Sequence, residues 1–78
     1  MSETIYRVAV YRLNNKTKVV HTFNDFDAAL DYYVRKIKQG IDNGFYFDID
    51  FDECHYDNEI QCLIIDTCVA AFTWDSDC

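Results

Sequence analysis

The chain has 78 residues, of which 50% are hydrophobic and 17% aromatic, and its formal net charge is −7 at pH 7. This apolar content excludes a disordered acidic tail, and the length predicts one domain spanning residues 1–78. No stretch approaches the ~20 apolar residues of a membrane span, and the N-terminus lacks the basic and apolar regions of a signal peptide. We therefore expect a soluble, cytoplasmic protein that does not enter a membrane.

The charges are divided between the two halves of the chain. Residues 1–38 contain all seven basic residues and four acidic residues, which gives a formal charge of +3. Residues 39–78 contain the other ten acidic residues and no Lys or Arg, which gives −10. Such a field disfavours nucleic-acid binding by the C-terminal half and favours basic partners.

The first two predicted elements are strands joined by a turn. Residues 4–13, TIYRVAVYRL, alternate between two faces and are rich in β-branched and aromatic side chains. Residues 14–17, NNKT, are typical of a turn, and residues 18–23, KVVHTF, have the composition of a second short strand. Together they predict an antiparallel hairpin.

A helix is predicted after this hairpin. Asn24 is a suitable N-cap, and Asp27 stands three residues on, in the place of a capping-box acid. Gly40, or Gly44 after Asn43, provides a left-handed exit from the helix. Apolar side chains that recur at three- and four-residue steps define one helix face: Phe26, Leu30, Tyr33, Ile37 and Ile41.

From residue 45 the period of the apolar pattern drops to two, which predicts a strand with one apolar and one acidic face. A turn near residues 56–58 then precedes a long last strand over residues 59–74, with Phe51 opposite Leu63. The order strand-strand-helix-strand-strand predicts an α+β fold. We expect a four-stranded antiparallel sheet with one helix packed on one of its faces.

Residues 48–59, DIDFDECHYDNE, place acids at four anchor positions of an EF-hand calcium loop. However, Glu53 stands where that loop needs glycine, and both flanking segments have the periodicity of strands rather than of helices. The spacing of the four cysteines is also not that of a zinc site. We therefore expect a strand over this segment and no metal site.

As a strand, the same segment predicts a row of carboxylates on an exposed face. Alternate residues are about 6.8 Å apart, so the aspartates repel one another, and Asp is depleted in strands where Thr or Lys serves solubility at less cost. We therefore expect a functional acidic surface. The expected centre of this surface consists of Asp48, Asp50, Asp52 and Glu53. Its margin consists of Asp57, Glu59 and Asp66. The expected aromatic anchors are Tyr46, Tyr56 and Trp74.

Carboxylates in such an array imitate the phosphates of a nucleic acid, so the expected partner is a protein with a basic groove that normally holds DNA or RNA. In its size, its one-sided charge and the stretch DIDFDECHYDNE, the chain resembles the phage-encoded DNA mimics and anti-CRISPR proteins. The resemblance involves no family-specific motif and transfers no residue roles. It implies a non-enzymatic inhibitor that occupies the nucleic-acid site of a bacterial defence complex, such as a Cas effector, in an infected or lysogenic host.

An enzyme is one alternative. The only two serines lie near the ends of the chain, and Cys54 and His55 are strand neighbours that point to opposite faces. Paired carboxylates such as Asp50 and Asp52 serve acid–base chemistry only in a cleft, for which a chain of this size leaves little room. We therefore expect no catalytic residues and no cofactor.

A self-associating structural protein is another alternative. The basic half of one copy can dock on the acidic half of the next, and Cys62, Ile64 and Phe72 or Trp74 can form an apolar patch that pairs across a twofold axis. A homodimer of this kind still presents two acidic faces. Direct nucleic-acid binding by the basic half is disfavoured because ten acids lie in the same small chain.

Overall fold

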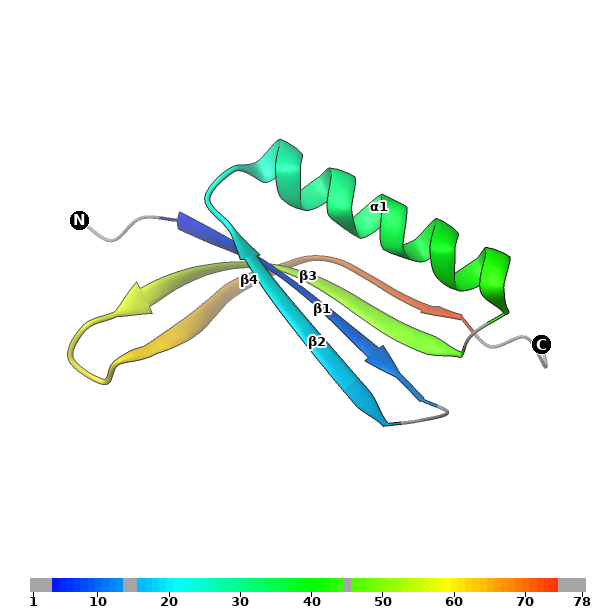
Figure 1. Ribbon diagram of the computed structural model, residues 1–78. Coiled ribbons are helices and arrows are strands. Elements are labelled where there is room, and N and C mark those ends of the chain that lie inside the picture. Colours follow the sequence, from blue (N-terminus) through cyan, green and yellow to red (C-terminus); the bar gives the residue numbers. More distant parts are fainter. Residues whose placement is uncertain (1–3, 14–15, 45, 75–78) are drawn as a thin grey trace.

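The computed structural model describes residues 4–13, 16–44 and 46–74 and shows a two-layer α+β fold (Figure 1). Four strands form one antiparallel sheet in the order β2-β1-β3-β4, and the helix lies across one face of it. The predicted fold class is confirmed. No helix in this part of the chain is both long and apolar enough to cross a membrane. The elements are β1 (Thr4–Arg12), β2 (Thr17–Phe23), α1 (Phe26–Asn43), β3 (Phe47–Asp57) and β4 (Cys62–Trp74).

The core lies between α1 and the central strands β1 and β3. Strand alternation directs every second side chain of these strands toward the helix, which produces a helix side and an outer face of the sheet. Val8, Ile49 and Phe51 are completely buried on the helix side. The buried cluster contains these three with Ala29, Tyr33 and Phe47.

The helix begins one residue later than the sequence pattern suggests. Asp25, not Asn24, is the N-cap, and its carboxylate accepts a hydrogen bond of 3.1 Å from the backbone N–H of Ala28. Asp27 therefore lies in the first helical turn, where it stabilises the positive end of the helix dipole instead of completing a capping box. At the other end Gly44 has φ of 70°, which confirms the expected left-handed exit.

The side of α1 that contacts the sheet differs from the predicted apolar face. Of the five predicted residues only Tyr33 is buried, whereas Leu30 and Ile41 are 39% and 38% exposed. Small residues account for the difference: a Cβ atom on Gly40 would lie 2.3 Å from the ring of Phe47. The helix therefore approaches the sheet most closely along its small residues, and the larger apolar side chains lie to one side of the contact.

The pairing of β3 with β4 also differs from the predicted register. Phe51 lies opposite Ala70, not Leu63, because the turn occupies residues 58–61 and the last strand begins at Cys62. Asp57 stabilises this turn, since its carboxylate accepts hydrogen bonds from the backbone N–H groups of Glu59 (2.8 Å) and Ile60 (3.4 Å). Two register shifts further along the pairing displace β4 again.

The β3–β4 hairpin extends beyond the rest of the sheet. Among the described residues, the pairing of β1 with β3 ends at Thr4 opposite His55, and beyond this point β3 and β4 pair with each other alone. Figure 1 shows the turn of this hairpin far from α1. The molecule is correspondingly elongated, with extents of 44 × 24 × 16 Å. We refer to residues 53–66 as the hairpin end.

Candidate protein-binding interface

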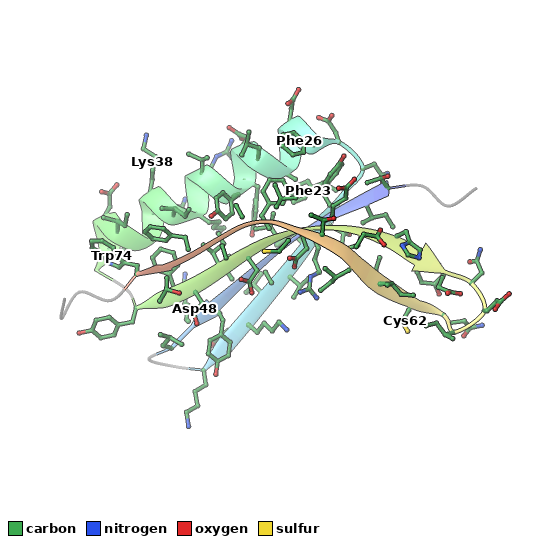
Figure 2. All side chains as sticks on the ribbon, turned by 180° about the vertical axis from the view of Figure 1, so that it is seen from behind. Phe23, Phe26, Lys38, Asp48, Cys62 and Trp74 are labelled. Atoms are coloured by element: carbon green, nitrogen blue, oxygen red, sulfur yellow. The ribbon has the colours of Figure 1, made fainter. Side chains whose placement is uncertain are left out.

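Asp48 and Asp50 lie on the outer face of the sheet, as expected from the alternation of β3. Asp48 lies between Tyr11 of β1 and Thr73 of β4, on the side away from α1 (Figure 2). Asp50 is exposed and lies between two alanines of the same strands, Ala9 and Ala71. Neither aspartate has a basic residue as its direct cross-strand neighbour on β1 or β4.

Asp52 has a different environment from the other two aspartates of β3. It is only 5% exposed, and its carboxylate accepts a hydrogen bond of 3.1 Å from Nη2 of Arg7, its cross-strand neighbour on β1. The prediction that all three aspartates line an exposed face is therefore wrong for Asp52. A buried carboxylate needs a compensating charge, and Arg7 provides it. Asp52 thus contributes to the fold rather than to the exposed surface.

Cys54 adjoins this ion pair and is completely buried. Burial raises the pKa of its thiol, although the nearby guanidinium of Arg7 acts in the opposite direction. A nucleophilic cysteine instead requires a lowered pKa and an accessible sulfur. These properties are those of a packed structural cysteine. The other two described cysteines, Cys62 and Cys68, are free and exposed.

Four acids occupy the hairpin end, and each has a different environment. By strand alternation Glu53 points away from the face that holds Asp52. Asp57 holds the turn, and Glu59 is exposed within it. Asp66 lies beside His55, with 2.8 Å between its Oδ2 and the ring Nδ1. The sequence contains no Lys or Arg between residues 53 and 66, so this segment is uniformly acidic.

Exposed apolar side chains lie among these acids. Tyr56, Ile60 and Ile65 are 42%, 60% and 49% exposed, respectively. Ile60 was missed in the sequence pattern, although an isoleucine in a turn between Glu59 and Gln61 is an indication of an exposed apolar contact. The hairpin end therefore combines negative charge with exposed apolar area, which makes it a candidate interaction surface.

The three expected aromatic anchors do not come together. Tyr46 precedes β3 and Tyr56 lies near its end, so nearly the whole strand separates them. Trp74 lies opposite Phe47 at the far end of the sheet and stacks on Phe72, with 6.4 Å between the ring centroids. It is partly buried and packed against the core. Tyr56 is thus the only one of the three on the hairpin end.

The apolar patch expected for a twofold interface is also divided. Cys62 and Ile64 lie near the turn of the hairpin, whereas Phe72 and Trp74 lie at the opposite end of β4 (Figure 2). All of these residues lie on the one strand β4, and Phe72 follows Cys62 by ten positions, so they are far apart along its length.

The segment that resembles a calcium loop is a strand and a turn. Residues 48–57 lie in β3, which confirms the expected strand. In an extended strand the acidic side chains cannot surround one ion. Within the described residues, no three side chains of His, Cys, Asp or Glu are grouped as a metal ion would require.

Comparison with known proteins finds no family model, no curated protein and no solved structure that matches this chain. Its function must therefore be inferred from its own residues and their arrangement.

Proposed function

We propose that this protein is a non-enzymatic inhibitor that places the hairpin end in the basic nucleic-acid-binding groove of another protein. The observation that carries this proposal is the hairpin end itself. Its turn lies beyond Thr4, the first described residue of β1, and the hairpin end as a whole bears four carboxylates and contains no Lys or Arg. Asp48 and Asp50 add a second acidic surface on the outer face of the sheet, on the other side of the Arg7–Asp52 ion pair.

The charges and the apolar side chains have different roles in this proposal. An exposed ion pair contributes only about 0.2–1 kcal/mol, so the carboxylates mainly accelerate association and fix the orientation of the complex. Most of the binding energy comes from side chains that lose contact with water in the complex. Tyr56 and Ile60 are the exposed side chains of the hairpin end that are best suited to this role.

The class of target follows from the same chemistry. A Lys- and Arg-lined groove that holds phosphates also attracts an array of carboxylates, and occupation of the groove excludes the nucleic acid. The resemblance to DNA mimics and anti-CRISPR proteins adds the proposal that this target is a bacterial defence complex, such as a Cas effector. The protein would then act in the cytoplasm of the bacterial host.

The test is capture of partners from a bacterial lysate by the immobilised protein, followed by competition. We expect the captured proteins to be nucleic-acid-binding proteins that are released when salt rises from about 0.05 M to about 0.5 M. Short duplex DNA or RNA should also displace them, because it occupies the same groove. Retention of partners that neither salt nor nucleic acid displaces would contradict the proposal.

A second candidate function, self-association, is favoured by exposed apolar area outside the hairpin end. Leu30, Val34 and Ile41 of α1 are 39%, 47% and 38% exposed. The helix packs over β1, β2 and β3, while β4 forms an edge of the sheet with Val69 39% exposed. Such an edge can pair with a second copy. Sedimentation at increasing concentration tests this candidate: a mass that stays at 9.2 kDa excludes it.

A further inference from the structure

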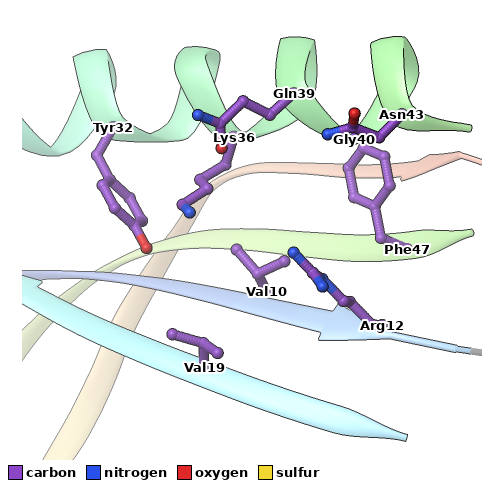
Figure 3. Close-up of a pocket in the computed structure, with 9 residues that line it drawn as sticks. All are labelled: Val10, Arg12, Val19, Tyr32, Lys36, Gln39, Gly40, Asn43 and Phe47. Atoms are coloured by element: carbon purple, nitrogen blue, oxygen red, sulfur yellow. The ribbon is translucent and has the colours of Figure 1, made fainter. Parts of the chain in front are cut away.

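A pocket lies between α1 and the sheet, on the side of the molecule formed by β1 and β2 (Figure 3). Its cavity volume is about 70 Å³, so it encloses a single small group and leaves the remainder of a ligand on its open side. Side chains from β1, β2, α1 and β3 line it. The pocket shares no residue with the hairpin end.

Two cationic side chains approach this pocket from opposite walls. Arg12 comes from β1 and Lys36 from α1, and Figure 3 shows their head groups on either side of Val10. The ammonium group of Lys36 lies 5.4 Å from the centroid of the Tyr32 ring. Among the described residues that line the pocket, Arg12 and Lys36 are the charged ones, and both are basic. They bring positive charge to this side of a chain whose formal net charge is −7.

Uncharged hydrogen-bonding groups surround these cations. Burial raises the pKa of Tyr32, so its hydroxyl remains a proton donor at neutral pH. Its ring is held in place by His21 and Phe23, with ring centroids 4.9 and 5.4 Å away. The side-chain amides of Gln39 and Asn43 also line the pocket. These groups can all donate hydrogen bonds to an anion.

The floor of the pocket is apolar. Val10 and Val19 lie opposite each other on β1 and β2, and Val19 is 43% exposed. The ring of Phe47 forms an end wall because Gly40, which has no side chain, lets it lie against the helix. An inorganic ion would leave this apolar surface uncovered, whereas an organic ligand would cover it.

We propose that this pocket binds a small organic phosphate, with its phosphate group between Arg12 and Lys36 and its apolar part over Val10 and Val19. A phosphate monoester carries a charge between about −1.5 and −2 at pH 7, so cationic side chains attract it more strongly than they attract a carboxylate. The two side chains would contact the phosphate group in different ways: Arg12 donates a planar pair of hydrogen bonds, and Lys36 acts as a point charge.

The experiment is an NMR titration of the ¹⁵N-labelled protein with phenyl phosphate, inorganic phosphate and phenol. We expect phenyl phosphate to shift the amide resonances of residues around the pocket. It should bind at least about fivefold more tightly than inorganic phosphate or phenol, because only phenyl phosphate contacts both the cationic side chains and the apolar floor. Equal binding of phenyl phosphate and inorganic phosphate, or shifts confined to other parts of the chain, would overturn the proposal.

Val19 and Val20 provide a matched pair of variants for this titration. They are adjacent on β2 and equally exposed, at 43% and 44%, but they point to opposite faces of the sheet. Val19→Glu puts a carboxylate into the pocket and should weaken phenyl phosphate binding about tenfold or more. Val20→Glu makes the same change of charge on the outer face and should leave binding within about twofold. Equal effects of the two variants would refute the site.

Lys36→Gln tests the cation directly, and Lys18→Gln on the outer face of β2 is its control. We expect about a tenfold loss of binding for Lys36→Gln, since one charge-assisted hydrogen bond is removed, and little change for Lys18→Gln. A dispersed amide spectrum shows that each variant is folded. If Lys36→Gln binds phenyl phosphate as tightly as the parent, the proposed ligand orientation is wrong.

Discussion

Arg7 of β1 and Asp52 of β3 are cross-strand neighbours, 45 residues apart in sequence, that form an ion pair of 3.1 Å on the sheet face opposite the helix. This pair divides the acidic residues of β3. On one side Asp48 and Asp50 remain on the outer face, and on the other side lies the acidic hairpin end. The pair itself stabilises the sheet between these two surfaces.

The first prediction concerns this ion pair. Arg7→Met leaves a buried carboxylate without its partner and should lower the free energy of unfolding by about 2–4 kcal/mol. This loss is smaller than the ~3–5 kcal/mol typical of broken buried pairs because the Arg7 side chain is 23% exposed. Urea denaturation of Arg7→Met, Asp52→Asn and the double variant measures the coupling. If the two single losses simply add in the double variant, the pair does not stabilise the fold.

The second prediction concerns the reactivity of the cysteines. Because Cys54 is completely buried and its pKa is raised, it should resist alkylation in the folded protein, while the exposed Cys62 and Cys68 react first. Peptide mass spectrometry after a short exposure to iodoacetamide measures this order. Labelling of Cys54 as fast as Cys62 would show that the outer face opens readily.

The third prediction concerns the dependence of stability on pH that the same thiol produces. The folded pKa of Cys54 is raised above its ordinary value of 9.0, so the unfolded chain loses this proton at lower pH than the folded one. The unfolded state then binds fewer protons, and the free energy of unfolding should fall as pH rises through 9.0 toward the folded pKa. Cys54→Ala should reduce this alkaline slope. Burial also raises the pKa of Tyr32 and Tyr33, so part of the slope should persist.

The fourth prediction concerns Gly40. Alanine normally stabilises a helix interior by about 1 kcal/mol relative to glycine, but here a Cβ atom would lie 2.3 Å from the Phe47 ring. We therefore expect Gly40→Ala to destabilise the protein by about 1–3 kcal/mol. Adding Phe47→Leu should recover part of this loss relative to Phe47→Leu alone, which thermal denaturation can measure. A stabilising Gly40→Ala would mean that the helix can move away from the sheet at no cost.

The order of elements and the alternation of β3 could be predicted from the sequence because each depends on local patterns. The apolar residues Phe47, Ile49 and Phe51 alternate with aspartates, and all three are buried as this pattern predicts. The exit at Gly44 could be predicted for the same reason, since an Asn-Gly pair is a local indication of a left-handed residue.

The features that were missed depend on contacts between distant residues. The burial of Asp52 requires Arg7 to lie opposite it, and no local pattern specifies which residue of β1 pairs with it. The register of β3 with β4 depends on the length of the turn and on two irregularities within the pairing. The side of α1 that contacts the sheet likewise depends on how closely the ring of Phe47 approaches Gly40.

The measurement that tests the proposed function most directly is the affinity of a captured partner for three double variants that each remove two negative charges. Glu53→Gln with Glu59→Gln changes the hairpin end, and Asp48→Asn with Asp50→Asn changes the outer face. The control changes two exposed acids of α1, Asp27→Asn with Asp42→Asn.

We predict that the hairpin-end variant weakens binding about tenfold or more and loses much of its salt dependence. The outer-face variant should weaken binding by a smaller factor, and the helix control should change it less than about twofold. Equal losses for all three variants would show that only the net charge matters. Unchanged binding of the hairpin-end variant would contradict the claim that the hairpin end enters a basic groove.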